Sequence, residues 1–304
     1  MTFRIVFGDA QNMAEVPDGT VHLVVTSPPY FNAPFDYPDL FPSYDAYCAT
    51  MHAVAREIWR VLADGRTVCV VCDDVLVNGE RYPIVSDLTK IFVEIGFRYR
   101  DRLVWLKPEG YIRISRRSGV LLQHPYPLYF YPDNVQESVL IFQKGRFDYR
   151  SVSDEVREAS RLDLNEYQKR KWYLNVWHIT NVLPLKGRLE EGIAAFPEEL
   201  ARRLILLFSH KGETVLDPFL GSGTTMKVAR LLGRSCIGYE LDLELLPIIR
   251  QKVGMDNASL LDDARFEVII RDDARHLRTW LSEQVKQRRS AARDAQGHSK
   301  RLKR

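Results

Sequence analysis

Short apolar runs typical of buried β-strands alternate along this chain with longer segments of helical periodicity. This alternation predicts an α/β fold, in which helices cover both faces of a doubly wound, mostly parallel sheet. We expect Ala63, Asp64 and Gly65 to end the first helix. The expected strands cover residues 3–8, 21–26, 67–72, 102–106, 138–143, 213–219 and 235–241, and the expected helices cover residues 44–62, 83–95, 197–209 and 224–232.

The alternation is interrupted between residues 110 and 185, where Tyr, Pro, Arg and Asp are frequent and only residues 138–143 read as a strand. We interpret residues 110–185 as an insertion that varies with the partner. It separates two regular parts, residues 1–109 and residues 186–283. Residues 284–304 contain eight Lys or Arg and one Asp, and this composition predicts a disordered basic tail.

The sequence also indicates whether the protein spans a membrane and whether it binds a metal. No apolar run approaches the roughly 18 residues of a membrane-spanning helix, and the first residues lead into a strand rather than a signal peptide. We therefore expect a cytoplasmic protein with no membrane partner. Cys69 and Cys72 have CxxC spacing, but we interpret them as core residues and expect no metal site, because they fall on opposite faces of an expected strand.

The sequence TSPPYFN ends the strand expected at residues 21–26. Proline has no N–H and favours extended geometry in the residue before it, so Pro28 and Pro29 end the strand and stiffen the turn. The turn presents Tyr30 and Phe31 at the carboxyl end of a parallel strand, where ligands bind in open sheets. The aromatic pair is either a stacking platform or part of an ordinary turn.

The sequence TVLDPFLGSGTT contains a second strand end with a glycine-rich turn. The strand ends at Asp217, Gly221 and Gly223 allow a close approach of the backbone to a ligand, and Thr224 begins a helix. Glu240 ends the next strand, where a carboxylate can hold both hydroxyls of a ribose. The GxGxxG of dinucleotide sites and the Gly-Lys-Ser/Thr of phosphate-binding loops are both missing here. The pattern indicates a nucleoside ligand without a pyrophosphate, a description that S-adenosylmethionine fits.

Residues 98–117 contain seven Lys or Arg with Tyr99, Trp105 and Tyr111 interleaved among them. Cations that contact phosphates, combined with rings that stack on bases, are typical of a nucleic-acid surface. A solvated charged face is the alternative interpretation. Together with the basic tail, the stretch indicates a polyanionic partner.

Two motifs, TSPPY and then DPFLGSGTT, resemble those of the DNA amino-methyltransferases that modify exocyclic nitrogens. Their order resembles the permuted β group, in which a catalytic block precedes a target-recognition region and a cofactor block. The stretches RVLADG, LVWLKP, ESVLIFQKG, NVW and FPEELARRLI extend the likeness over most of residues 3–250. The resemblance implies a circularly permuted Rossmann-like fold. Residues 1–109 would be its catalytic half, 110–185 the inserted target-recognition region and 186–283 the cofactor-binding half.

The resemblance further implies an enzyme that extrudes a base from DNA and methylates its exocyclic amino group with S-adenosylmethionine. Tyr30 would stack on the extruded base, while the Ser27 side chain and the Pro28 carbonyl would accept hydrogen bonds from the amino group. The expected catalytic residues are Ser27, Pro28, Pro29 and Tyr30. The expected cofactor-binding residues are Asp9, Asp217, Phe219, Gly221, Gly223, Thr224 and Glu240.

The acidic residue expected near the adenine has two candidate positions. Asp9 in FGDA matches the family pattern, and FEVIIRDDARHL repeats this pattern with Asp272 and Asp273. We prefer Asp9, because it precedes TSPPY as in the family. We interpret the second copy as an added strand and helix, whose role the sequence does not define.

The resemblance implies double-stranded DNA as the substrate, recognised within residues 110–185. We also expect contacts from the segment 167–172. The expected DNA-binding residues are Arg113, Arg116, Arg117, Lys169, Arg170 and Lys171. A cognate restriction endonuclease and a homodimer are both left open.

In this family, Ser-Pro-Pro-Tyr occurs more often with N4 of cytosine, and Asp-Pro-Pro-Tyr with N6 of adenine. We therefore expect cytosine N4 as the target and keep adenine N6 as the alternative. Rival classes are a catalytically silent DNA-binding regulator, a nucleotide-dependent oxidoreductase, and a methyltransferase of RNA or protein. The intact motif residues disfavour the regulator, and the missing third glycine disfavours the oxidoreductase.

Overall fold

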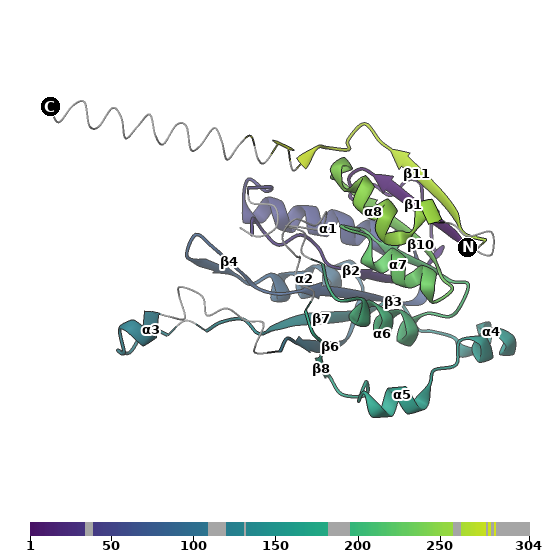
Figure 1. The fold of residues 1–304 in the computed structure, drawn as a ribbon, viewed down its shortest axis with the longest axis horizontal. Helices are drawn as coiled ribbons and strands as arrows, with labels where there is room; N and C mark the ends of the chain where they lie inside the picture. The colour runs from purple at the N-terminus through teal and green to yellow at the C-terminus, as the bar shows by residue number, and fades with distance from the viewer. Residues whose placement is uncertain are drawn as a thin grey trace.

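The computed structural model describes residues 1–33, 39–108, 120–130, 132–181, 195–257, 263–277, 279, 280 and 283. The strands of the central sheet are β1 (Thr2–Phe7), β2 (Val21–Thr26), β3 (Leu62–Cys72), β6 (Arg98–Leu106), β7 (Gln136–Gln143), β8 (Val176–His178), β9 (Thr214–Asp217), β10 (Ser235–Glu240) and β11 (Arg265–Ile270). Within the described residues they form one nine-stranded sheet (Figure 1), in the order β11-β1-β10-β9-β2-β3-β7-β6-β8. A separate hairpin consists of β4 (Val75–Val77) and β5 (Glu80–Tyr82).

The direction of the strands determines where a ligand can bind. Strand β7 is antiparallel to its neighbours β3 and β6, whereas the other pairs in the sheet are parallel. The carboxyl ends of β1, β10, β9, β2 and β3 therefore meet along one edge of the sheet, together with the amino end of β7. Ligands bind at this edge in open parallel sheets.

Two hydrophobic cores lie on opposite faces of the sheet, under the helices that Figure 1 shows on either side of it. Val68 belongs to one core and Cys69 to the other, because alternate residues of β3 point to opposite faces. The doubly wound fold predicted from the sequence is confirmed. Among the described residues, no helix is long and apolar enough to cross a membrane. The helices of the first face are α1 (Tyr44–Val61) and α2 (Ile84–Ile95), and those of the second are α6 (Glu198–Phe208), α7 (Thr224–Leu231) and α8 (Leu246–Val253).

Helix α1 begins and ends for local reasons. The Ser43 hydroxyl accepts a hydrogen bond from the backbone N–H of Ala46 at 3.1 Å and caps the first turn. The helix ends at Val61, and the chain continues directly into β3. The prediction that residues 63–65 end the helix is wrong. Gly65 lies instead inside β3, where the pairing with β2 shifts register.

The range predicted as an insertion contributes two strands to the sheet. Strand β7 lies between β3 and β6, and β8 lies beside β6, so residues 110–185 are not a separate unit as a whole. The helices α3 and α4 of this range lie at opposite ends of the molecule in Figure 1. The boundaries of a target-recognition region remain a prediction. The further short helices of the chain are α3 (Val120–Gln123), α4 (Asp154–Ala159), α5 (Leu164–Lys169) and the 3-10 turns η2 (Tyr149–Ser151), η3 (Leu243–Leu245) and η4 (Met255–Asn257).

Candidate cofactor and base site

One pocket of about 290 Å³ lies at the carboxyl edge of the sheet, near the lower end of the size range for small-molecule sites. It collects residues from the ends of β1, β2, β9 and β10, as the strand directions require. Asp217, Gly223 and Thr224 belong to the same strand end and turn but do not line this pocket. The sequence-predicted residues that line it are Asp9, Ser27, Pro28, Pro29, Tyr30, Phe219, Gly221 and Glu240.

Glu240 is held rigidly at the end of β10. Its side chain is only 9% exposed, and its two oxygens accept backbone N–H groups of Gly221 at 2.8 Å and of Asp242 at 2.9 Å. Burial raises the pKa of this carboxyl to about 8. Each oxygen keeps a further lone pair, so the carboxylate can accept hydrogen bonds from the hydroxyls of a ribose.

Asp217 is a buried residue that stabilises the turn after β9. Its carboxylate accepts hydrogen bonds from the Thr26 hydroxyl at 2.7 Å and from the Phe219 N–H at 3.1 Å. Burial raises the pKa of Asp217 to about 7. Asp217 is 1% exposed, so it does not form the surface of the pocket. Its hydrogen bonds instead connect the ends of β2 and β9.

The glycine turn has the geometry that its sequence predicts. Gly221 has a φ of 54° and Gly223 a φ of 90°, both in the left-handed region. Gly223 caps α7, and the buried Thr224 hydroxyl at the start of that helix has no hydrogen-bond partner within the described part of the chain. A buried hydroxyl and the N–H groups at a helix start suit an anionic ligand group. Thr224 does not line the pocket, however, so the group at its surface that fits S-adenosylmethionine is the Glu240 carboxylate, which suits the ribose.

The turn after β1 places Asp9 beside Glu240. Strand β1 pairs directly with β10, and Phe7 lies opposite Glu240 in the register. The Asp9 carboxylate accepts hydrogen bonds from the backbone N–H of Gln11 at 2.9 Å and from its side-chain amide at 2.8 Å. Asp272 and Asp273 follow β11, one strand further from β10. This geometry supports the preference for Asp9 near the adenine.

Tyr30 lines the pocket from the turn after β2 and is held by two residues that the sequence did not indicate. Its hydroxyl donates to Glu137 Oε2 at 3.0 Å, and Lys107 Nζ pairs with Glu137 Oε1 at 2.6 Å. Glu137 reaches this edge because β7 is antiparallel and begins here. Burial, followed by the Glu137 charge, raises the pKa of Tyr30 well above its ordinary value, so the phenol stays neutral.

Phe31 does not extend the platform. Its side chain is 6% exposed, and its ring centroid lies 4.7 Å from that of Tyr82 and 5.2 Å from that of Tyr44. The interpretation of Tyr30 and Phe31 as a stacking pair is therefore wrong for Phe31, which is a core residue. Asn32 has a φ of 45° and fixes this turn through two hydrogen bonds with the backbone of Phe41.

A further buried carboxyl, Asp73, follows β3 at the same edge. The Asn134 side chain donates a hydrogen bond to it. Burial, supported by the charges of Glu137 and Asp74, raises the pKa of Asp73 to about 6. The Asp-Asp pair after a predicted strand was the available sequence signal for this group, but its partner Asn134 lies 61 positions away.

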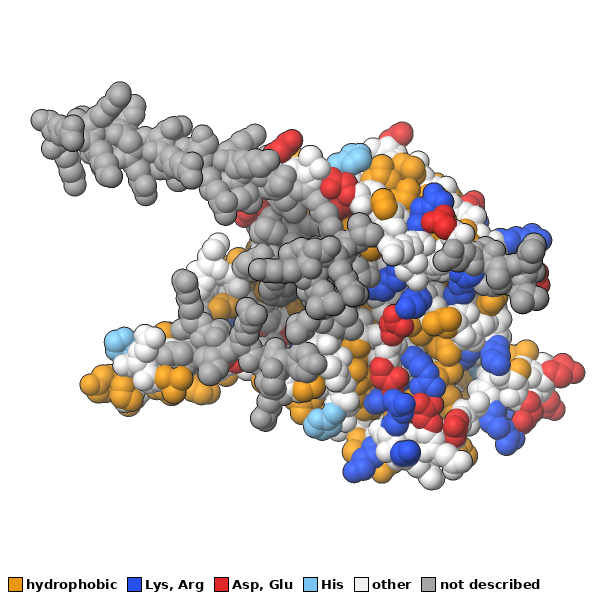
Figure 2. Space-filling model, in the orientation of Figure 1, with side chains coloured by type: hydrophobic (Ala, Val, Ile, Leu, Met, Phe, Trp, Pro, Cys, Tyr) orange, Lys and Arg blue, Asp and Glu red, His pale blue; other side chains and the backbone are white. Residues whose placement is uncertain are grey.

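The residues predicted to bind DNA are only partly described. Arg113, Arg116 and Arg117 lie outside the described residues, as does the basic tail 284–304. Lys169 ends α5, Arg170 caps it, and Lys171 follows. Arg170 pairs with Glu166 and with Glu199, each at 3.1 Å, and Figure 2 shows the basic side chains around α5 and α6 mixed with acidic ones. This neighbourhood is not a purely cationic surface.

The described part of the stretch 98–117 consists mainly of strand β6 (Arg98–Leu106), and its tryptophan is a core residue. Trp105 is 2% exposed and donates from its indole to the Ile179 carbonyl at 2.8 Å. The basic residues at the start of β6 lie at the edge opposite the pocket, because β6 runs parallel to β3. In the segment 167–172, the Trp172 ring is 4% exposed and packs against Arg202 and Arg203. Neither tryptophan presents its ring to a base.

A doubly wound sheet with a glycine turn and a buried ribose-type carboxylate at its carboxyl edge defines a nucleoside-cofactor enzyme of the Rossmann-like class. A family model described as DNA methylase matches residues 21–251, and the chain belongs to this family of N4 and N6 amino-methyltransferases. It is therefore an S-adenosylmethionine-dependent DNA methyltransferase of the β group, as the sequence motifs predicted.

The chain is similar to curated methyltransferases along most of its length. It is 34% identical over 300 residues to the type II methyltransferase M.MjaI of Methanocaldococcus jannaschii, covering 88% of this chain and 96% of that relative. Among solved structures it is similar to a putative DNA modification methylase of Thermus thermophilus, TTHA0409, complexed with S-adenosyl-L-methionine, with a TM-score of 0.68, 29% identity and coverage of 88% and 99%. The PvuII cytosine-N4-specific methyltransferase has a TM-score of 0.58 at 19% identity, covering 88% of this chain and 96% of that one, and thus shares the fold.

Proposed function

We propose that the enzyme methylates N4 of cytosine at a specific site in double-stranded DNA. The observation that carries this proposal is the position of the turn Ser27-Pro28-Pro29-Tyr30 on the wall of the pocket that Glu240 also lines. Serine at the first position of this turn is the form that goes more often with cytosine N4 in the family. A DNA adenine methyltransferase, YhdJ of Escherichia coli, is 26% identical over 261 residues and keeps adenine N6 as the competing target.

The proposed reaction begins with extrusion of the base, because an amino group inside the duplex cannot reach a cofactor pocket at a sheet edge. The Tyr30 ring stacks on the extruded base and recovers part of the lost stacking energy, roughly 1–3 kcal/mol. Glu137 and Lys107 hold the phenol of Tyr30 in place. A neutral phenol is required here, since a phenolate beside Glu137 would add a second negative charge.

S-adenosylmethionine supplies the methyl group from its sulfonium centre. The Ser27 hydroxyl and the Pro28 carbonyl accept hydrogen bonds from the amino group of the base, which draws its lone pair out of conjugation with the ring. Pro29 keeps Pro28 extended, so this carbonyl has a fixed direction. No strong base is needed before transfer, because the nitrogen becomes acidic only as its new bond to carbon forms and the carbon–sulfur bond breaks; its surplus proton then passes to water.

Expression of the protein in cells without endogenous DNA methylation tests the target base. Nucleosides from digested DNA are separated and identified by mass spectrometry, and we expect N4-methylcytosine in a single sequence context. Detection of N6-methyladenine would contradict the cytosine assignment and leave the methyltransferase class intact. Cells that express Tyr30→Ala are the control, because their DNA should carry far less of the same modification.

The type II names of the relatives support a restriction–modification setting. M.MjaI carries the type II name, whereas M.BamHII of Bacillus amyloliquefaciens, 29% identical over 254 residues, is named an orphan methyltransferase. We propose a cognate endonuclease that cuts the same site when it is unmethylated. Extracts of the source cells should cut unmodified DNA and spare DNA methylated by this enzyme. A homodimer is a separate prediction, and sedimentation velocity measures the oligomeric state that tests it.

A further inference from the structure

The C-terminal segment 265–277 reaches the cofactor pocket from outside the residues matched by the family model, 21–251. Its strand, β11, pairs with β1 along the whole strand, from Thr2 opposite Arg265 to Phe7 opposite Ile270. After the strand, the chain turns over the edge of the sheet, and Arg275 and Leu277 line the pocket. The segment therefore contacts both the outer side of β1 and the cofactor cavity.

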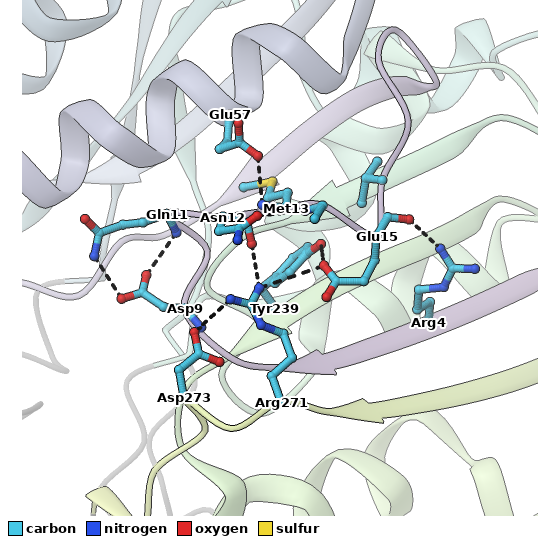
Figure 3. A network of polar contacts seen from close by, with 12 residues as sticks. Arg4, Asp9, Gln11, Asn12, Met13, Glu15, Glu57, Tyr239, Arg271 and Asp273 are labelled. Carbon is cyan, nitrogen blue, oxygen red and sulfur yellow. Dashed lines mark hydrogen bonds and ion pairs between the residues drawn. The ribbon is translucent and has the colours of Figure 1, made fainter.

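Asp273 and Arg271 hold the turn that carries Asp9, as Figure 3 shows. The Asp273 carboxylate accepts the backbone N–H of Asp9 at 3.1 Å and the Arg271 guanidinium at 2.8 Å. Arg271 also donates to the carbonyl of Asn12 at 2.7 Å, and its own N–H donates to the carbonyl of Phe7 at 2.9 Å. Three of these contacts connect the C-terminal segment to the beginning, middle and end of the turn, and the ion pair between Arg271 and Asp273 joins two residues of the segment itself.

The approach of the two segments is close enough to require a glycine. A Cβ atom at Gly8 would lie 2.8 Å from Asp273 Oδ1 and 2.8 Å from Arg271 Cδ. The Gly8 N–H donates to the carbonyl of Glu240 at 2.8 Å, and the Gln11 N–H donates to Asp9 Oδ1 at 2.9 Å. Among the backbone N–H groups of Gly8, Asp9 and Gln11, that of Asp9 donates to a side chain of the C-terminal segment.

The far end of the segment is attached beside Glu240. The Arg275 N–H donates to the carbonyl of Leu241 at 2.8 Å, and the Leu243 N–H donates to the carbonyl of Arg275 at 2.8 Å. Leu277, only 4% exposed, donates its N–H to Asp242 Oδ1 at 3.2 Å. The segment thus bridges the strand ends that carry Asp9 and Glu240.

We propose that the C-terminal segment 265–277 is a working part of the S-adenosylmethionine site. Asp273 is a positioning residue, which fixes the turn of Asp9 at the adenosine end of the cofactor. Arg275 and Leu277 form the outer wall of the same end. The repeated Asp-Asp pattern in the sequence is thereby assigned a role, since Asp273 acts through the backbone of Asp9 instead of binding the cofactor itself.

The neighbouring carboxylates provide a matched pair for the test, because Asp272 is exposed. Asp273→Ala should raise KM for S-adenosylmethionine about tenfold, with KM for DNA and kcat at saturating cofactor within twofold of wild type. Asp272→Ala should leave all three constants unchanged. Asp273→Asn, which keeps an acceptor for the Asp9 N–H, should fall between them.

The dissociation constant of 5′-methylthioadenosine, measured by calorimetry, tests which end of the cofactor is affected. This ligand lacks the amino-acid half, so Asp273→Ala and Leu277→Ala should each weaken it by about the same factor as the full cofactor. Gly8→Ala should also weaken the binding of 5′-methylthioadenosine, because the added methyl group would clash with the Asp273 carboxylate and displace it.

Three results would overturn the proposal. The first is an equal effect of Asp272→Ala and Asp273→Ala on KM for the cofactor. The second is a lower kcat with an unchanged KM, which a merely structural role of Asp273 would produce. The third is an unchanged affinity for 5′-methylthioadenosine. Each can be distinguished from an error in the assigned base, because none depends on which base is methylated.

Discussion

The two proposed walls of the pocket, a cofactor wall around Glu240 and a base wall around Tyr30, hold their side chains by different means. On the cofactor wall, both oxygens of Glu240 accept backbone N–H groups, from Gly221 and Asp242. On the base wall, Tyr30 bonds to a side chain, and Glu137 is held in turn by Lys107. Backbone donors keep their direction when a side chain changes rotamer, whereas a chain of side chains does not. The cofactor wall is therefore preformed, and the base wall can be altered one contact at a time.

The largest expected effect tests the preformed wall. At pH 9, where the carboxylate is ionised, Glu240→Ala should weaken S-adenosylmethionine binding at least a hundredfold, since it removes a charged acceptor for two hydroxyls and leaves two N–H groups unpaired; each charge-assisted hydrogen bond contributes roughly 1.5–3 kcal/mol. Calorimetry measures this loss, and Glu198→Ala, on the exposed side of α6, is the control. Near-normal affinity would exclude Glu240 as the ribose acceptor.

Tyr30→Ala is expected to have the next largest effect, confined to the base wall. Loss of stacking worth roughly 1–3 kcal/mol should reduce methyl transfer about tenfold or more. Cofactor affinity should stay near normal, because the Glu240 contacts are made by backbone groups. Methylation rates and calorimetry on the same preparation check both parts, with the exposed Tyr149→Ala as control. Wild-type turnover by Tyr30→Ala would exclude Tyr30 as the residue that stacks on the base.

The pH dependence of adenosine binding tests the buried charge on the cofactor wall. The pKa of Glu240 in the free protein is about 8, so below pH 8 a proton must leave before both oxygens can accept ribose hydroxyls. Affinity for 5′-methylthioadenosine, which lacks an ionisable amino acid, should therefore rise about tenfold from pH 7 to pH 9 and then level off. A flat profile would contradict the expectation that ionisation of Glu240 controls adenosine binding.

The smallest effects sharpen the description of the base wall. Tyr30→Phe and Glu137→Ala should each slow methylation about threefold to fivefold, because each removes the same hydrogen bond at 3.0 Å. The double variant should be no slower than the slower single variant, as a double-mutant cycle for one shared contact requires. Multiplication of the two effects would mean that Glu137 acts independently of Tyr30.

The cofactor wall was predictable because its signals are local. Gly221 and Glu240 are only 19 positions apart, and strand ends, glycine turns and the alternation of strands and helices are visible in short windows. The turn Ser27 to Tyr30 was predicted to lie at this edge too, but the support of Tyr30 was not, since Tyr30 and Glu137 are 107 positions apart and meet only because β7 is inserted antiparallel between β3 and β6.

The burial of individual side chains was the second property that could not be predicted from the sequence. Trp105 and Trp172 stand among arginines, and composition cannot say that their rings face the core. The choice between Asp9 and the Asp272–Asp273 pair had the same origin, because both follow equivalent strands. Only the order of the strands, with β1 between β10 and β11, decides which carboxylate lies beside Glu240.

The position of β1 between β10 and β11 also bears on how the protein is made. This strand, whose Phe3, Ile5 and Phe7 are fully buried in the finished fold, pairs with β10, and Thr2 leaves the ribosome 233 positions ahead of Ser235. At synthesis rates of about 5–20 residues per second, β1 waits on the order of 10 to 50 s for its partner. An apolar segment exposed for so long is a natural client for chaperones. Because Glu240 ends β10 and lines the pocket, the pocket cannot be complete before this strand has been made.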